Sequence, residues 1–275
     1  MISDNSSFNL RRIVSSKREK LIAAYQAGKS IKVADESAQI NREFDPFMFL
    51  HSVGYPTVGH AVEVGSSYPY QSQFRDEILR VNSEICMVEI GHRKPLPSWH
   101  PTTFSLIDVR QEVCATLSYS FGHFENVKIY NIGISDTTGT KKMIWKDGST
   151  YEDGVLSPNV QNFSEGDGRP QAEFTAKCFS FGDVDTGNIG LLAADVEGNE
   201  YYVIKTMKSR PIIITLELYT LEYGTMSKSQ YMNPYIDEIS QWMNENYYIP
   251  FNFSAGDVAF LRADFYDTLK EEGKI

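Results

Sequence analysis

The chain has 275 residues, of which 41% are hydrophobic and 23% charged, values typical of a soluble globular protein and not of a disordered or fibrous one. Acidic residues outnumber basic ones by 36 to 26, for a net charge of −10, so most of the surface is expected to repel the phosphates of a nucleic acid. The sequence contains neither an apolar run of the roughly 18 residues that a membrane span needs nor a signal peptide, so we expect a cytoplasmic protein with no membrane partner.

The N-terminal part is expected to form a helical extension, residues 1–57, in front of an α/β domain at 58–275. A first helix is predicted from Leu10 to Gln26, where apolar residues recur at roughly helical spacing and the chain is at its most basic. A second helix is predicted at 46–51, with Asp45 as its N-cap. The basic residues indicate a solvated helix face, because no aromatic residues alternate with them as in a nucleic-acid-binding patch.

From residue 60 onward, strand-like and helix-like segments alternate, which is typical of a doubly wound α/β sheet. Strands are predicted at 60–65, 85–91, 104–108, 127–134, 139–145, 174–181, 191–194, 212–218, 247–253 and 257–262. Helices are predicted at 71–81, 110–120, 201–208 and 231–242. The strands at 191–194 and 212–218 are mostly apolar, so we expect helices to cover both faces of the sheet there. Residues 146–170, rich in Gly, Ser, Asp and Asn, are expected to form a long loop that acts as a lid or a binding loop, or is disordered.

No residue pattern predicts a disulfide or a zinc site. Cys86, Cys114 and Cys178 lie far apart in apolar contexts, as reduced core thiols do, and no two histidines have metal-ligand spacing. A hard cation on the acids of residues 195–200 stays open as an alternative, because carboxylate oxygens alone can bind one. We predict no metal site.

Acidic residues stand at the ends of several predicted strands. Glu89 and Gly91 end one strand and Asp108 ends the next, which suits a nucleoside ligand, since glycine lets the backbone approach the ligand and a carboxylate accepts hydrogen bonds from both ribose hydroxyls. Asp195 ends the strand at 191–194 in the same way. The chain has no G-x-G-x-x-G loop and no Walker motif, which disfavours a dinucleotide or triphosphate ligand.

One acidic run carries a family resemblance. The run is Asp195-Val196-Glu197-Gly198-Asn199-Glu200, followed by Val203-Ile204, Pro211 and Leu216-Glu217, and it resembles the D-V-E-G-x-E signature of FkbM-type methyltransferases. Residues 126–139 are similar to the third strand and hairpin of that family, and residues 256–262 to its last strand. The likeness covers about residues 85–262 and implies a class I methyltransferase-like, mostly parallel seven-stranded sheet that binds S-adenosylmethionine.

The resemblance leaves two positions for the cofactor loop. In the first, which we favour because the later elements follow in the family's order, Glu89 and Gly91 border the methionine portion of the cofactor and Asp108 binds its ribose. In the second, residues 62–67 form the loop and Glu89 binds the ribose. The first departs from the family pattern, because Gly91 runs into a Pro-rich segment at 92–101.

The favoured arrangement assigns the remaining site residues. Gly133 and Ile134 flank the adenine, and Asp195 lies beside the cofactor and the transferred methyl group, where it orients the substrate or accepts its proton. His92 is a second candidate base. Glu200 is expected to stabilise the start of the following helix rather than to act in catalysis.

The sequence thus predicts an S-adenosylmethionine-dependent methyltransferase, and the resemblance implies O-methylation of a hydroxyl on a saccharide or small metabolite. A non-catalytic, methyltransferase-like binding or scaffold protein is one alternative, because residues 92–101 carry Pro, Arg and Lys where glycines are expected. A nucleic-acid methyltransferase is another, supported only by the basic N-terminal stretch. Neither the acceptor nor the oligomeric state follows from the sequence.

Overall fold

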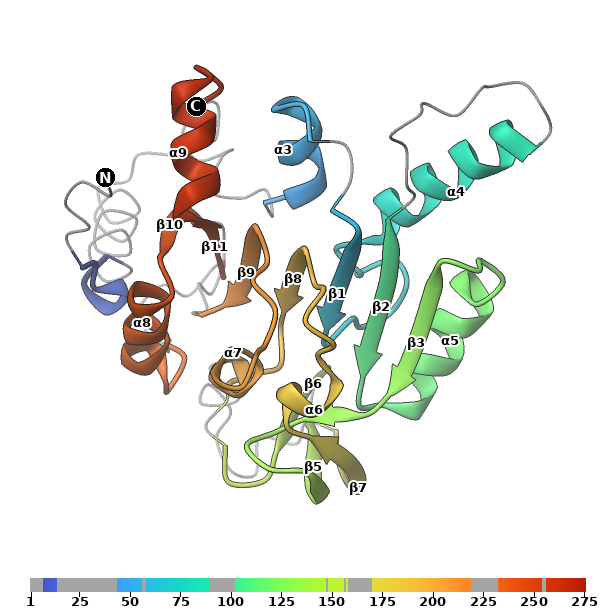
Figure 1. The fold of residues 1–275 in the computed structure, drawn as a ribbon. Coiled ribbons are helices and arrows are strands. Elements are labelled where there is room, and N and C mark those ends of the chain that lie inside the picture. The colour runs from blue at the N-terminus through green and yellow to red at the C-terminus, as the bar shows by residue number, and fades with distance from the viewer. Residues whose placement is uncertain are drawn as a thin grey trace, which may run out of the picture.

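The structure is a computed structural model that describes residues 7–13, 44–55, 58–89, 102–146, 148–155, 157, 170–218, 232–253 and 256–275, with side chains throughout except at 84–89. Within these ranges the chain forms a large sheet with helices on both faces and a small sheet beside it (Figure 1). No helix of the described part is long and apolar enough to cross a membrane.

The large sheet has seven strands and is mostly parallel, as predicted. Its strands are β1 (His60–Val64), β2 (Thr103–Asp108), β3 (Val127–Asn131), β8 (Leu191–Ala194), β9 (Ile213–Glu217), β10 (Tyr248–Phe253) and β11 (Asp257–Arg262). They lie in the order β10-β11-β9-β8-β1-β2-β3, and β11 runs antiparallel to both of its neighbours.

The chain order of the strands reverses at the centre of this sheet. From β1 the chain builds outward through β2 to β3, whereas β8, on the other side of β1, is followed outward by β9. Open α/β sheets bind ligands at such a switch point, in the crevice beyond the carboxyl ends of the strands. The topology therefore directs attention to the loops that follow β1, β2 and β8.

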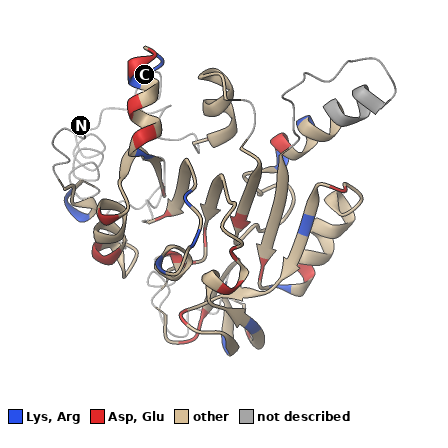
Figure 2. Ribbon diagram, viewed as in Figure 1, with Lys and Arg blue, Asp and Glu red and all other residues tan. Residues whose placement is uncertain are grey.

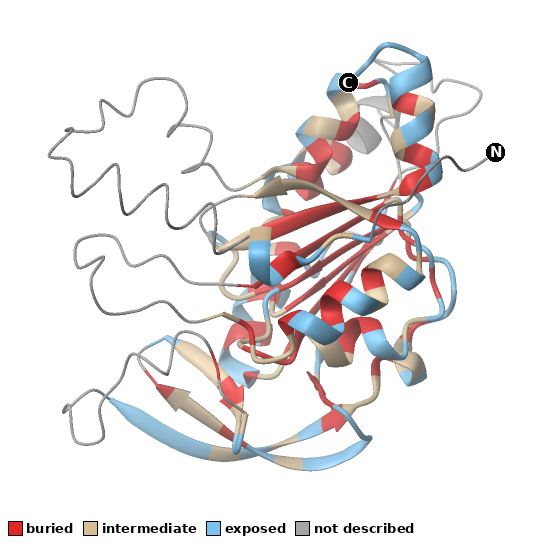
Figure 3. Cartoon of the chain, turned by 90° about the vertical axis from the view of Figure 1, so that its left-hand side faces the viewer, coloured by how far each residue is buried: buried red, intermediate tan, exposed pale blue. Residues whose placement is uncertain are grey.

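Helices cover the two faces of the sheet and bury a hydrophobic core on each (Figure 3). One face carries α3 (Pro46–Ser52), α4 (Arg75–Glu89), α5 (Gln111–Phe121) and α9 (Ala263–Glu271). The other carries α6 (Phe181–Val184), α7 (Glu200–Lys205) and α8 (Ile236–Glu245). The neighbours Leu191 and Leu192 of β8 are both fully buried, one in each core, which explains the continuous apolar run of this strand.

The described parts of the N-terminal extension pack onto this sheet. Leu10 is fully buried in the core beneath α8, and its backbone N–H donates to Ser240 Oγ at 3.2 Å. α3 forms where it was predicted, and the Asp45 carboxylate caps it by accepting hydrogen bonds from the N–H groups of Phe47 and Met48, both at 2.9 Å. The boundary at residue 57 stays a prediction.

The small sheet lies beside the carboxyl ends of the parallel strands (Figure 1). It consists of β4 (Gly133–Ile134), β5 (Gly139–Lys146), β6 (Ser149–Glu152) and β7 (Gln171–Phe179), in the order β4-β7-β5-β6. The segment 146–170 is therefore not all loop, because β6 pairs with β5 in an antiparallel hairpin. Residues 158–169 of this segment lie outside the described part.

The predicted strand at 85–91 is wrong, because α4 continues through this sequence to Glu89. Apolar residues at 74, 78, 81 and 85 follow the helical period, and β1 pairs directly with both β2 and β8, which leaves no place for a strand between them. In Figure 1, α4 ends far from the edge at which β1 and β2 end. Glu89 is thus in the last turn of a helix and not at a strand end.

Candidate functional site

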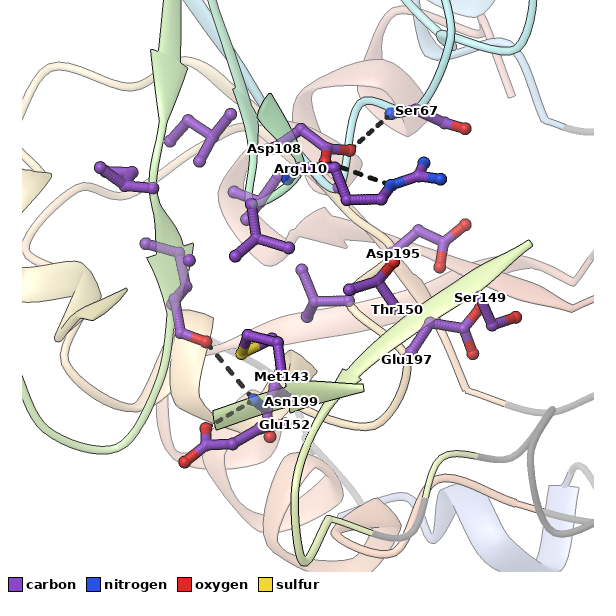
Figure 4. Close-up of a pocket in the computed structure, with 18 of the residues that line it drawn as sticks. Ser67, Asp108, Arg110, Met143, Ser149, Thr150, Glu152, Asp195, Glu197 and Asn199 are labelled. Atoms are coloured by element: carbon purple, nitrogen blue, oxygen red, sulfur yellow. Dashed lines mark hydrogen bonds and ion pairs between the residues drawn. The ribbon is translucent and has the colours of Figure 1, made fainter. Parts of the chain in front are cut away.

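A cleft opens at the carboxyl edge of the large sheet, at the switch point between β1 and β8 (Figure 4). It encloses about 630 Å³ of space between protein atoms, open solvent included. The loops after β1, β2 and β8, the β4 strand and the β5–β6 hairpin contribute its lining: Val64, Gly65, Ser67, Ile107–Arg110, Ile132–Ile134, Met143, Gly148–Thr150, Glu152, Asp195–Glu197 and Asn199.

The loops after β1 and β8 touch each other at Gly65. This residue has a φ of +81°, and a Cβ atom placed on it would lie 1.7 Å from the backbone carbonyl oxygen of Asp195. The Asp195 N–H in turn donates to the Val64 carbonyl at 3.0 Å. Only glycine permits both this conformation and this approach, so the bottom of the cleft depends on it.

Asp108, at the end of β2, connects the second loop to the first. Its Oδ2 accepts a hydrogen bond from the Ser67 N–H at 3.1 Å, and its Oδ1 accepts one from the Arg110 N–H at 2.8 Å. The Arg110 Nε lies 3.6 Å from the same Oδ1, and its guanidinium stands over the ring of Tyr68. Burial raises the pKa of Asp108, although these donors oppose the shift. The carboxylate lines the cleft with lone pairs left for a ligand.

The buried side chain of Glu200 stabilises the turn after β8 by hydrogen bonds to its backbone. Its carboxylate is fully buried and accepts hydrogen bonds from the N–H of Val196 at 2.8 Å, from the N–H of Gly198 at 3.1 Å, and from Asn233 Nδ2. Burial raises the pKa of Glu200 to about 8 against these bonds. These hydrogen bonds, on either side of Glu197, keep that residue in a left-handed conformation, with a φ of +55°. The structure thus gives Glu200 the structural role that the sequence predicts, although it supports the turn more than the helix.

Three carboxylates stand side by side at the ends of adjacent strands. Ala194 pairs with Leu216 and Asp257 pairs with Glu217, so Asp195, Glu217 and Asp257 follow one another across β8, β9 and β11. Asp195 and Glu217 each have an oxygen within 4.8 Å of the other, so their negative charges repel each other.

The pKa of Asp195 and that of Glu217 are both raised well above their ordinary values, first by loss of water around them and then by the neighbouring carboxylates. Because Asp195 is exposed at the cleft, repulsion by the neighbouring carboxylates explains the rise in its pKa better than loss of water does. Oxygens of Asp195, Glu200 and Glu217 lie within 4.8 Å of one another, a spacing that a divalent cation requires. Both Glu200 oxygens, however, already accept the hydrogen bonds of the turn.

The cleft brings together four of the predicted site residues, Asp108, Gly133, Ile134 and Asp195. Glu89 is separated from them with α4, and nothing further is described of its side chain; Gly91 and His92 lie outside the described residues. Both predicted arrangements of the cofactor loop use Glu89 as the acid at a strand end, and the helix at this residue contradicts that part of each. The β1 loop of the second arrangement lies beside Asp108, the acid of the first.

Sequence reasoning assigned no role to three residues at or next to the cleft: Arg110, Asn199 and Glu217. Glu217 could have been found by the rule that identified Asp195, because it too directly follows an apolar strand segment. Arg110 stands two residues after Asp108, close enough in sequence to suggest a pair. The position of Asn199 in the cleft depends on contacts with distant segments, and no local pattern indicates its role.

No family model matches the chain, and no curated protein is significantly similar to it in sequence. The function must therefore be inferred from the cleft itself.

Proposed function

We propose that the protein is an S-adenosylmethionine-dependent methyltransferase and that this cleft holds the cofactor. The observation that carries the proposal is charge: among the lining residues Asp108, Glu152, Asp195 and Glu197 are acidic, and Arg110 is the one cation. Acidic residues stand at the carboxyl ends of several parallel strands (Figure 2). Such a cleft favours a cationic ligand and disfavours the phosphates of a dinucleotide or of ATP. S-adenosylmethionine is cationic at its sulfonium and amino groups, and when bound it supplies an electrophilic methyl group.

The lining residues also match the parts of this cofactor. Asp108 offers a buried carboxylate to the two ribose hydroxyls, the role that an acid at this strand end has in nucleoside-binding sheets. Val109, Ile132 and Ile134 form an apolar wall suited to a flat base. The seven-stranded, mostly parallel sheet and the D-V-E-G-x-E turn at the cleft add support from the family resemblance.

Asp195 and its close neighbour Glu217 suit the binding of an acceptor hydroxyl. Methyl transfer to a hydroxyl needs a nucleophile held in place and a group that takes its proton, and a carboxylate whose pKa is raised is a better proton acceptor than an ordinary one. We assign Asp195 the contact with the acceptor hydroxyl and Glu217 the positioning of Asp195. A hydroxyl of a saccharide or small metabolite is the acceptor that the resemblance favours.

The scaffold alternative loses its motivation, because it assumed that the Pro-rich segment 92–101 stands where the cofactor loop belongs. Gly65 and Ser67 of the β1 loop line the cleft at that place. The nucleic-acid alternative rests on basic residues of which all but Arg11 and Arg12 lie outside the described part, and Arg11 is paired with Asp237 on α8.

Replacing Asp108 with alanine is expected to weaken binding of S-adenosylhomocysteine by about 10- to 100-fold, the loss of a pair of hydrogen bonds to a charged group. Titration calorimetry measures this directly. Glu112→Ala is the matched control, because this acid is exposed on the first turn of α5 and does not line the cleft. Wild-type protein that gives no heat with either S-adenosylmethionine or S-adenosylhomocysteine would sink the proposal.

A further inference from the structure

Two buried oxygens of the cleft lining have no hydrogen-bond partner among the described residues. Asn199 is only 3% exposed, and its Oδ1 is unpartnered among the described residues. The same is true of Thr150 Oγ1 on β6. Both residues line the cleft, and Asn199 lies with Met143 and Glu152 at the end opposite Ser67 and Asp108 (Figure 4).

The orientation of the Asn199 amide is determined by its surroundings. Its Nδ2 donates to the Ile134 carbonyl at 3.4 Å and to Glu152 Oε2 at 3.3 Å. Turning the amide over would place its oxygen against these two acceptors, so the unpartnered atom is the oxygen. Glu152 is itself held by Ser135 Oγ at 2.6 Å and by Lys141 Nζ at 3.3 Å. Asn199 Oδ1 is therefore a hydrogen-bond acceptor held in a fixed position, with no donor among the described residues.

A buried polar atom without a partner destabilises a protein by roughly 1–3 kcal/mol, and a ligand that supplies the missing donor recovers that free energy on binding. Asn199 bonds to Ile134, on the edge where the proposed function places the base. Several of the side chains that line the cleft are apolar, among them Val109, Ile132, Ile134, Met143 and Val196. A flat apolar ring with a hydrogen-bond donor on its far edge fits this arrangement.

An adenine ring has those properties, because its exocyclic amino group is a donor. Hypoxanthine has the same shape but carries a carbonyl oxygen at that position, which would face Asn199 Oδ1 as a second acceptor. A site built to hydrogen-bond one substrate group rejects an analogue that lacks it, because its own buried polar atom is then left unpaired. We infer that Asn199 Oδ1 accepts a hydrogen bond from the amino group of adenine and makes the cleft selective for adenosyl over inosyl ligands. This inference rests on the proposed function.

Calorimetric titration of the wild-type chain with S-adenosylhomocysteine and with S-inosylhomocysteine tests it. We expect the adenosyl compound to bind roughly tenfold or more tightly than the inosyl compound. Asn199→Ala should remove this preference by weakening the adenosyl compound alone. Asn188→Ala, at an exposed asparagine away from the cleft, should leave the preference unchanged.

Equal affinities in the wild type, a comparison that needs no variant to fold, would overturn the role of Asn199 while leaving the proposed function intact. A preference that survives Asn199→Ala in a folded variant would do the same. Absence of binding by either compound would overturn the proposed function and this inference together.

Discussion

Gly65→Ala is expected to destabilise the protein by on the order of 4 kcal/mol or more, placing it among the most damaging single substitutions of this chain. The added Cβ would stand 1.7 Å from the Asp195 carbonyl oxygen. The backbone fixes the position of the Cβ atom, and the carbonyl oxygen belongs to the backbone, so no side-chain rotation can relieve the overlap. The loops after β1 and β8 must separate, and ligand binding in the cleft should be lost as well. Urea denaturation measures the first effect, and calorimetry with S-adenosylhomocysteine measures the second.

Gly59→Ala is the matched control, because Gly59 has nearly the same conformation, with a φ of +75°, and nothing lies within 4 Å of the position of its Cβ. It should lower the free energy of unfolding by only about 1–2 kcal/mol, the strain of a left-handed alanine. If Gly65→Ala and Gly59→Ala reduced stability equally, the close contact between the two loops would not exist in solution.

The second large effect concerns the dependence of stability on pH, through Glu63 of β1. This side chain is 4% exposed, and its two oxygens accept hydrogen bonds from Ser72 Oγ at 2.6 Å and from the Gln73 N–H at 2.7 Å. Burial raises the pKa of Glu63 to about 7, more than these bonds lower it. In the unfolded chain the pKa returns to its ordinary value of 4.5. Between these values the folded state holds a proton that the unfolded state has lost.

The contribution of Glu63 to the free energy of unfolding should therefore fall by about 3 kcal/mol as the pH rises from 4.5 to 7, and should level off above that range. Glu63→Gln removes this titration but keeps the shape and the acceptor for the Gln73 N–H, so it should make the profile less steep between pH 4.5 and 7 and be more stable than the wild type at pH 8. Chemical denaturation at several pH values gives the slope. Glu238→Gln, on the exposed face of α8, should not change it. An unaltered slope in Glu63→Gln would show that the carboxyl group is not buried as described.

Much of the fold could be predicted from the sequence, because buried parallel strands have a composition of their own. The apolar runs of β8 and β9 identify strands that are covered on both faces, and the structure confirms both. The run at 85–91 looks the same locally, but its described residues, 85–89, form the end of α4. Only the pairing of β1 with β2 and β8 shows that this run is not a strand of the sheet. A local sequence pattern does not reveal such pairing between distant segments.

Helix α9 was not predicted, for a related reason. It begins at Ala263, directly after the last residue of β11, with no glycine, proline or other turn residue to separate the two elements. Its buried residues Phe265 and Leu269 are four apart, but one such pair is too short a pattern to distinguish a helix from the end of a strand.

The sequence predicts those residues of the candidate site that stand at the carboxyl ends of parallel strands. Asp108 and Asp195 directly follow apolar strand segments, and the topology brings both to the same edge of the sheet. The contact between Gly65 and Asp195 and the unpartnered oxygen of Asn199 arise where loops from separate parts of the chain meet. Such contacts follow from tertiary packing, and the sequence alone does not specify them.

The central claim is that the cleft between the β1 and β8 loops binds an adenosyl cofactor. A crystal structure determined with saturating S-adenosylhomocysteine tests it most directly. The account predicts the ligand in the cleft, with its ribose hydroxyls on the Asp108 carboxylate and its base against Gly133 and Ile134. Well-ordered crystals in which Asp108 contacts no ligand, or in which the compound is bound elsewhere on the protein, would contradict it.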